Sequence, residues 1–195
     1  MNRTMKAPWR KRARILGRGA VAALFAAGFF AGAAVAQDKG TLNPQPLPPL
    51  AKPDDPATPA KQLFGRKTGP APLQARTIGF YAKGCLAGGM ALPINGKTWQ
   101  VMRLSRNRNW GHPELVKLVE KLAVDAKAGD GWPGLLVGDL SQPRGGPMLT
   151  GHASHQVGLD ADIWLTPMPD RRLTEKERED LSATSMLAAD KISVD

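Results

Sequence analysis

The sequence lacks several features that define large classes of protein. Its 195 residues include a single cysteine, Cys85, so the chain cannot form a disulfide within itself. No stretch after residue 36 is apolar enough to cross a membrane, and there is no internal repeat. Aromatic residues make up only 6% of the chain. The apolar fraction of 42% and the charged fraction of 23% permit one folded domain with a core and argue against general disorder.

Acidic residues are absent from the first 36 positions, which carry seven arginine and lysine residues. The formal net charge of the whole chain is +10, but residues 37–195 contain 20 basic and 17 acidic residues. The positive charge therefore belongs mainly to the N-terminal segment. It does not indicate a domain that binds nucleic acid, and we expect no nucleic-acid partner.

The same N-terminal segment is typical of a secretory signal peptide. Its basic start precedes an apolar run over residues 20–35, and residues 34–36 (Ala-Val-Ala) fit a cleavage site before Gln37. A run of roughly 16 residues is short for a membrane span, which needs about 20. We therefore expect residues 1–36 to be a cleaved signal peptide rather than a retained anchor, and no stable membrane span after its removal.

Residues 37–195 fall into two parts that differ in composition. Nine prolines lie within residues 41–72, which have little hydrophobic periodicity, as is typical of a linker or an extended arm. We expect a proline-rich linker over residues 37–74 and a folded domain over residues 75–195. In an exported protein, the lone Cys85 is expected to be a free thiol, to bond to another molecule, or to pair with a cysteine absent from this chain.

The pattern of the folded domain predicts strands and helices. Strands are expected over residues 98–104, 134–140 and 159–165, and a short strand or loop over residues 76–81. One helix is expected over residues 113–128, with Pro113 at its first position. Thr174 and Glu177 form a capping-box pattern that predicts another helix to about Asp190. This pattern predicts an α+β fold with a mainly antiparallel sheet flanked by helices.

Two of the three histidines, His152 and His155, lie in a glycine-rich loop, and Asp160 and Asp162 follow His155 within seven residues. Zinc is bound in proteins by neutral imidazole and by carboxylate, and catalytic zinc sites leave one position for water. If the chain turns at Gly158, His155 and Asp162 could reach one metal ion. The same spacing also fits exposed loop side chains without a metal, because histidines three residues apart are not a specific signal.

The eleven residues 152–162 (HASHQVGLDAD) resemble the signature of the penicillin-insensitive murein endopeptidases. These are zinc peptidases related to lysostaphin-type and D-Ala-D-Ala dipeptidase enzymes. Flanking segments resemble the same family in order and spacing: Gly84-Cys85 and residues 100–103, 111–116 and 136–139. The similarity extends from about residue 76 to residue 195.

The resemblance implies that the sheet carries a zinc site. His155 and Asp162 match the family's pair of zinc ligands, and His152 matches a second histidine of the motif, which is a metal ligand or another residue of the site. Asp160 is expected to hold one of the ligands in position. The implied activity is zinc-dependent and penicillin-insensitive cleavage of the D-alanyl–meso-diaminopimelyl cross-links between stem peptides of peptidoglycan, in the periplasm.

The sequence departs from the family pattern near its C-terminal end. The family has a C-terminal His-x-His pair that supplies the third zinc ligand and a catalytic histidine, whereas no histidine follows His155 here. The family cysteine that bonds to the one matching Cys85 is also missing. We therefore expect residues 75–195 to be the N-terminal part of a longer enzyme domain, with the catalytic base unassigned. The alternative is a non-catalytic periplasmic protein that binds peptidoglycan.

Overall fold

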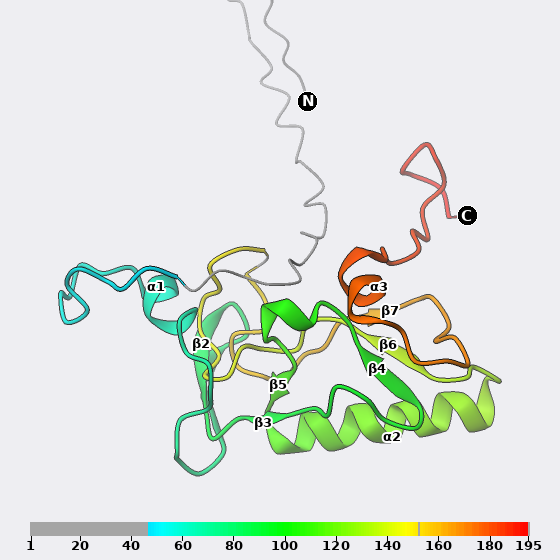
Figure 1. Cartoon of the computed structure of the whole chain (residues 1–195), viewed down its shortest axis with the longest axis horizontal. Helices are drawn as coiled ribbons and strands as arrows, with labels where there is room; N and C mark the ends of the chain where they lie inside the picture. The colour runs from blue at the N-terminus through cyan, green and yellow to red at the C-terminus, as the bar shows by residue number, and fades with distance from the viewer. Residues whose placement is uncertain (1–46, 152, 195) are drawn as a thin grey trace, which may run out of the picture. The chain divides into compact units, whose positions relative to one another are not determined.

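The computed structural model describes residues 47–151 and 153–194, shown in Figure 1. The predicted signal peptide and the first part of the predicted linker lie outside these residues. The helices are α1 (Ala60–Phe64), the 3-10 helix η1 (Leu104–Arg106), α2 (Pro113–Gly129) and α3 (Glu175–Asp180). The strands are β1 (Arg76–Phe80), β2 (Lys83–Ala87), β3 (Met90–Ala91), β4 (Trp99–Val101), β5 (Trp110–Gly111), β6 (Leu135–Val137) and β7 (Ile163–Trp164). Within the described part of the chain, no helix has the length and apolarity of a membrane span.

The strands form three small sheets rather than one. Two are antiparallel pairs, β1 with β2 and β3 with β5, and the third contains β4, β6 and β7 in that order. In the third sheet β6 runs parallel to β4 and antiparallel to β7. The α+β prediction is confirmed, but the sheet is mixed. The reason is that α2 carries the chain from β4 to β6, and a strand–helix–strand crossover brings the second strand back in the same direction.

Helix α2 covers one face of this three-stranded sheet. Its buried side chains share one side of the helix and pack against Val101 of β4 and against Leu135 and Val137 of β6. The helix begins as the sequence predicts, because His112 caps it and Pro113 follows at the first position. The His112 Nδ1 atom accepts a hydrogen bond of 3.3 Å from the Glu114 N–H. Each fully buried aliphatic side chain in this layer contributes about 1.5–3 kcal/mol relative to exposure.

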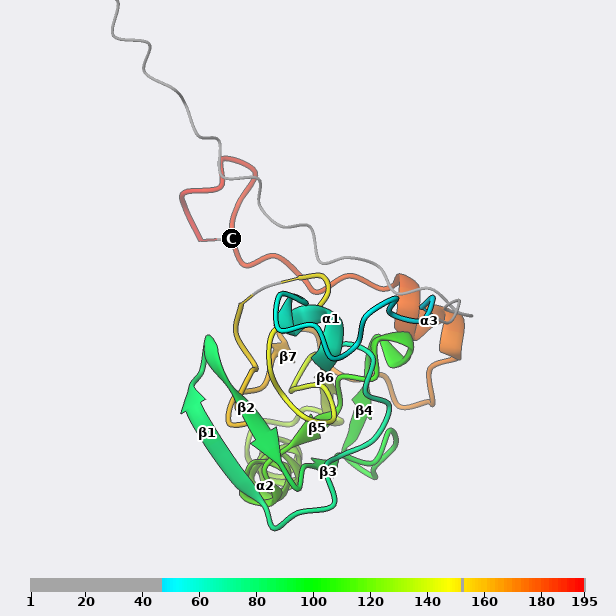
Figure 2. The ribbon, with the colours of Figure 1, turned by 90° about the vertical axis from the view of Figure 1, so that its left-hand side faces the viewer.

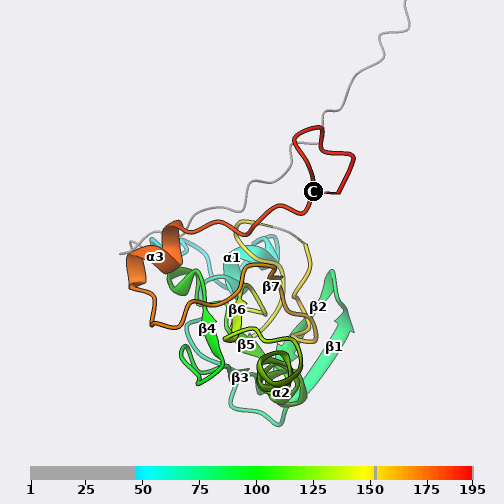
Figure 3. The same ribbon diagram turned by 90° about the vertical axis from the view of Figure 1, so that its right-hand side faces the viewer.

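The opposite face of the sheet packs against the segment that follows β7. Leu136 points away from Leu135 and Val137, because side chains alternate along a strand. It joins a second buried cluster with Met102, Trp164, Met168 and Leu173. Figures 1 and 3 show α2 on one side of β4, β6 and β7, and α3 on the other.

The predicted C-terminal helix begins at its capping box but ends earlier than expected. The Thr174 hydroxyl accepts a hydrogen bond from the Glu177 N–H, and the Glu177 carboxylate accepts one from the Thr174 N–H. The helix ends at Asp180, so the prediction of a helix to about Asp190 is wrong. The following residues are rich in hydroxyl side chains, which bond locally to the backbone instead of continuing a helix, as when Ser185 Oγ accepts from the Leu187 N–H.

Buried polar contacts fix α3 against the sheet. Arg178 is 2% exposed and donates hydrogen bonds to the carbonyl oxygens of Ile94 and Val101. The Glu179 carboxylate accepts from the backbone N–H and the hydroxyl of Ser105. These bonds tie the short helix to the chain on either side of β4.

The described part of the proline-rich segment contains the short helix α1 and contacts the domain. The Phe64 ring lies so close to Gly146 that a Cβ atom at that glycine would be 2.4 Å from the ring. Farther along, the Gly69 carbonyl accepts a hydrogen bond of 3.3 Å from Arg144 Nε. Residues 64–69 therefore pack on the loop that follows β6.

Candidate functional site

The predicted site residues lie in the loop between β6 and β7. Near the predicted site residues, the loop backbone is left-handed at His155 (φ 66°) and at Gly158 (φ 68°). A positive φ is uncommon for a residue other than glycine and marks His155 as a position whose conformation the surroundings impose. The chain turns at Gly158, as predicted, and returns toward β7.

Gln156 holds this loop against the β1–β2 hairpin. Its side chain is almost fully buried; Nε2 donates 2.9 Å hydrogen bonds to the carbonyls of Ala82 and Ala153, and Oε1 accepts from the Gly84 N–H at 3.2 Å. The Gln156 N–H also donates to the Tyr81 carbonyl at 3.1 Å. Figure 2 shows the hairpin beside this yellow-to-orange loop.

The side chains of His155, Asp160 and Asp162 come together. His155 Nδ1 lies 2.7 Å from Asp160 Oδ2, and His155 Nε2 lies 3.5 Å from Asp162 Oδ2. The imidazole is 3% exposed, whereas the two carboxylates are 36% and 41% exposed. Asp160 Oδ2 also accepts a 3.1 Å hydrogen bond from the His155 backbone N–H. The alternative of exposed loop side chains therefore does not describe His155, which is a buried ring between two acids.

The surroundings change the protonation of this ring. Burial by itself lowers the pKa of His155, but the contact with Asp162 and the charges of Asp160, Asp162 and Asp139 outweigh it, so the pKa is raised. Both ring nitrogens of a protonated imidazole are donors, so it can interact with both neighbouring carboxylates at once. The surroundings therefore favour the protonated form of His155, with the positive charge on the ring between the two carboxylates.

Asp162 is bonded to the segment at the end of β6, which contains a second group of charged residues. The backbone of Asp162 bonds to the end of β6, where its N–H donates to the Asp139 carbonyl and its carbonyl accepts from the Gly138 N–H. The buried Asp139 carboxylate is 2.8 Å from Arg108 and 3.1 Å from Arg106. Neither arginine was predicted from the sequence, and only the place of Asp139 in a segment resembling the family pointed to this position.

Arg108 also bonds to the part of the loop that precedes His152. Its Nη2 donates to the Thr150 carbonyl at 2.7 Å, two residues before His152. His152 itself lies outside the described residues, so its predicted role as a ligand remains a prediction. Among residues 47–151 and 153–194, no group of three or more histidine, cysteine or acidic side chains is arranged to hold a metal ion.

The donor atoms of His155 and Asp162 nevertheless fit two corners of a zinc site. With Zn–N and Zn–O bonds of about 2.0–2.2 Å and tetrahedral angles, two ligand atoms lie about 3.4 Å apart. The observed separation is 3.5 Å, which is long for a hydrogen bond. Metal-binding histidines also commonly have a carboxylate beside their second nitrogen, and Asp160 occupies that place here. His155 and Asp162 therefore fit two ligand positions of the zinc ion that the resemblance implies.

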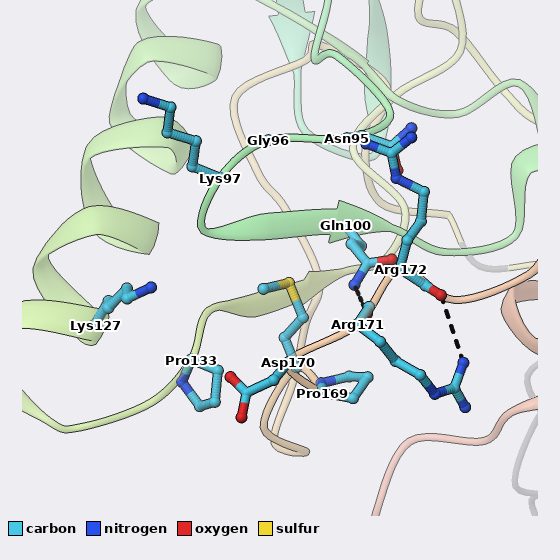
Figure 4. Close-up of a pocket in the computed structure, with 11 residues that line it drawn as sticks. Asn95, Gly96, Lys97, Gln100, Lys127, Pro133, Pro169, Asp170, Arg171 and Arg172 are labelled. Carbon is cyan, nitrogen blue, oxygen red and sulfur yellow. Dashed lines mark hydrogen bonds between the residues drawn. The ribbon is translucent and has the colours of Figure 1, made fainter.

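A cavity of about 230 Å³ lies at the other end of the three-stranded sheet (Figure 4). Its lining residues come from the start of β4, the end of α2, the approach to β6 and the segment after β7, and they include no histidine or cysteine. Arg171 extends away from Pro133 and Lys127 in Figure 4, and its guanidinium pairs with Glu177. The cavity is thus separate from the His155 cluster, which lies where β6 ends and β7 begins.

His155, Asp160 and Asp162 supply imidazole and carboxylate groups, which are among the ligand types that zinc takes in proteins. Residues 77–195 match the penicillin-insensitive murein endopeptidase family, and the chain belongs to this family of peptidases. The match confirms the resemblance in the sequence.

Relatives with that same name agree with the family match. The protein from Haemophilus influenzae is 54% identical over 92 residues, which make up 47% of this chain and 32% of that protein. The protein from Yersinia enterocolitica is 37% identical over 134 residues, 69% of this chain and 46% of its own length. For the protein from Citrobacter koseri the identity is 39% over 121 residues, 62% and 42% of the two chains. The chain thus spans between about a third and a half of the length of these curated relatives.

Proposed function

We propose that this protein is a zinc-dependent murein hydrolase that cleaves the D-alanyl–meso-diaminopimelyl cross-links between stem peptides in the periplasm. Membership of the peptidase family and the names of the relatives support murein as the substrate. The signal-like residues 1–36 support export. The observation that carries the metal-dependent part is the 3.5 Å separation between His155 Nε2 and Asp162 Oδ2.

In this proposal His155 and Asp162 hold the metal, and His152 from the same loop is a further ligand. When bound, zinc would polarise the scissile carbonyl and lower the pKa of a bound water to about 7. Asp160 keeps the imidazole oriented through its contact with Nδ1. The partial exposure of Asp162 leaves one side of the cluster accessible to a peptide substrate.

The metal part of the proposal is tested by measuring zinc affinity in competition with a chromophoric chelator. We expect His155→Ala and Asp162→Ala each to lower the zinc affinity by more than about tenfold, since the loss of a supporting contact alone lowers it by about 10–100-fold. His112→Asn is the matched control, because asparagine retains a good helix cap while removing an imidazole outside the cluster. Equal zinc affinity of the wild type and His155→Ala would refute the ligand assignment.

The hydrolytic part is tested on purified cross-linked muropeptides. Because no histidine follows His155 in this chain, we expect weak or no turnover from these residues alone, even with added zinc. With the family's C-terminal His-x-His segment appended, we expect zinc-dependent conversion of cross-linked dimers to monomers, unaffected by penicillin and abolished by His155→Ala. Binding of muropeptide without turnover by the extended chain would favour the alternative, a non-catalytic peptidoglycan-binding protein. The absence of both binding and turnover would refute murein as the substrate.

A further inference from the structure

The turn of the β1–β2 hairpin exposes two aromatic side chains in a chain that has few. Phe80 is 65% exposed and Tyr81 is 52% exposed, and their ring centroids are 4.5 Å apart in an edge-to-face arrangement. Exposed single apolar residues are ordinary, but adjacent exposed rings offer a large rigid surface to a partner. We call residues 80–83, which contain these rings, the hairpin tip.

The hairpin tip is fastened to the candidate metal loop. Gln156, the residue directly after His155, bonds through its backbone N–H to the Tyr81 carbonyl and through its side chain to the Ala82 carbonyl. Gln156 also accepts from the Gly84 N–H, so one side chain is bonded to both the turn and β2. The tip is therefore held at a fixed place next to the His155 cluster.

The hairpin tip also carries a positive charge. Lys83 is exposed and lies directly opposite Phe80 in the strand register, so the two side chains are on the same face of the hairpin. The tip thus combines an apolar ring surface with an ammonium group. A complementary ligand has an aliphatic part and a carboxylate close together.

We propose that the hairpin tip binds the stem peptide of murein beside the scissile cross-link. The rings of Phe80 and Tyr81 contact the aliphatic side chain of the meso-diaminopimelyl residue, and Lys83 pairs with one of its carboxylates. This inference rests on the proposed function, because murein is the substrate in both. The tip is a positioning and specificity element that lies outside the metal-binding loop and leaves the metal ligands unchanged.

The test is cosedimentation of the full chain with insoluble purified murein, in the presence of a chelator so that binding is measured without hydrolysis. The main variant is Phe80→Ala combined with Tyr81→Ala, and Tyr81→Ala and Lys83→Gln are tested separately. Leu118→Ala is the apolar control, because Leu118 is 60% exposed on α2, and Lys97→Gln is the charge control. Thermal unfolding of each variant checks that the fold is retained.

We expect the double variant to bind murein at least about tenfold more weakly, because central aromatic contacts carry much of the affinity of an interface. Lys83→Gln should weaken binding about threefold at low salt and reduce its salt dependence. The two controls should bind as the wild type does. In the hydrolysis assay the tip variants should raise KM more than they lower kcat.

The experiment distinguishes failure of the hairpin-tip proposal from failure of the proposed function. If the wild type binds murein and both the double variant and Tyr81→Ala bind equally well, the role of the hairpin tip is refuted while the proposed function stands. If the wild type neither binds nor cleaves murein, the proposed function is refuted, and the inference falls with it. If the double variant does not fold, Tyr81→Ala alone decides, since its side chain is half exposed in the turn.

Discussion

Replacement of Asp160 by alanine would separate the orientation of the His155 ring from its role as a ligand. Asp160 Oδ2 is 2.7 Å from His155 Nδ1 and also accepts a hydrogen bond from the His155 N–H. The same oxygen therefore fixes both the ring and the backbone of a residue in an unfavourable left-handed conformation. In Asp160→Ala the ring keeps its burial but loses the group that aims Nε2 at Asp162.

The expected loss of zinc affinity is about 10–100-fold, the usual effect of removing a carboxylate that supports a histidine ligand. This corresponds to about 1.4–2.8 kcal/mol of binding free energy. Competition with a chelator measures the affinity directly. Thermal unfolding with and without zinc provides a second readout, because the stabilisation by zinc must shrink as the dissociation constant rises.

Asp160→Asn and Asp170→Asn are the matched comparisons. Asparagine at position 160 retains an oxygen that can accept from the ring and from the backbone, so we expect an intermediate affinity. Asp170 lines the separate cavity, and its substitution should leave zinc binding unchanged. If Asp160→Ala binds zinc as tightly as the wild type, Asp160 does not orient the ligand and the geometric argument for this site is refuted.

Three further predictions concern the elements that support the site. Thr174→Ala should lower the free energy of unfolding by about 1 kcal/mol through loss of the helix cap, measured by urea denaturation; an unchanged midpoint would contradict it. The ion pair with Arg171 and the hydrogen bonds from Thr174 lower the pKa of Glu177 from 4.5 to about 2. Glu177 therefore stabilises the fold above about pH 4.5 and loses this effect as the pH falls through about 2, so the melting temperatures of the wild type and Glu177→Gln should converge over that range. Arg108→Ala removes one partner of the buried Asp139 carboxylate and should cost about 3 kcal/mol, and a loss below the error of urea denaturation would argue against a structural role for this pair.

The sequence predicted those helices and strands that are specified by residues close together in the chain. Helix α2 was predictable because a cap, a proline at the first position and apolar residues at helical spacing all coincide. Strand β6 was predictable from its unbroken apolar run, and all three of its residues are buried. The end of α3 was not, because the residues after Asp180 make both local bonds, as from the Leu187 N–H to Ser185 Oγ, and distant ones, as from the Thr184 N–H to the hydroxyl of Thr166.

The proximity of His155 to Asp162 was predictable from the sequence, but the geometry around them was not. The spacing of His155 and Asp162 indicated a shared position, and the structure brings their side chains together. The strand predicted over residues 159–165 is reduced to Ile163–Trp164, because Asp160 turns back to contact His155 instead of continuing the strand. Arg108 could not have been found from the pattern, since it pairs with a carboxylate 31 positions away and arginine is usually exposed.

The loop that carries the site is fixed by contacts that involve no metal. Gln156 ties it to the β1–β2 hairpin, and Asp162 bonds through its backbone to the end of β6. At Gly158 the carbonyl accepts a 2.8 Å hydrogen bond from the His112 N–H at the start of α2. Small zinc domains, in contrast, obtain their folding energy from the metal and unfold without it.

We therefore expect the removal of zinc to leave this fold intact. Circular dichroism spectra recorded with and without a chelator should coincide, while zinc should raise the melting temperature only as far as its binding to the folded state requires. Asp162→Ala, measured in chelator, should melt close to the wild type, because the backbone bonds of residue 162 do not depend on its side chain. Loss of secondary structure on chelation would show that the metal builds the loop, and the anchoring contacts of Gln156, Gly158 and Asp162 would then be too weak to position the ligands by themselves.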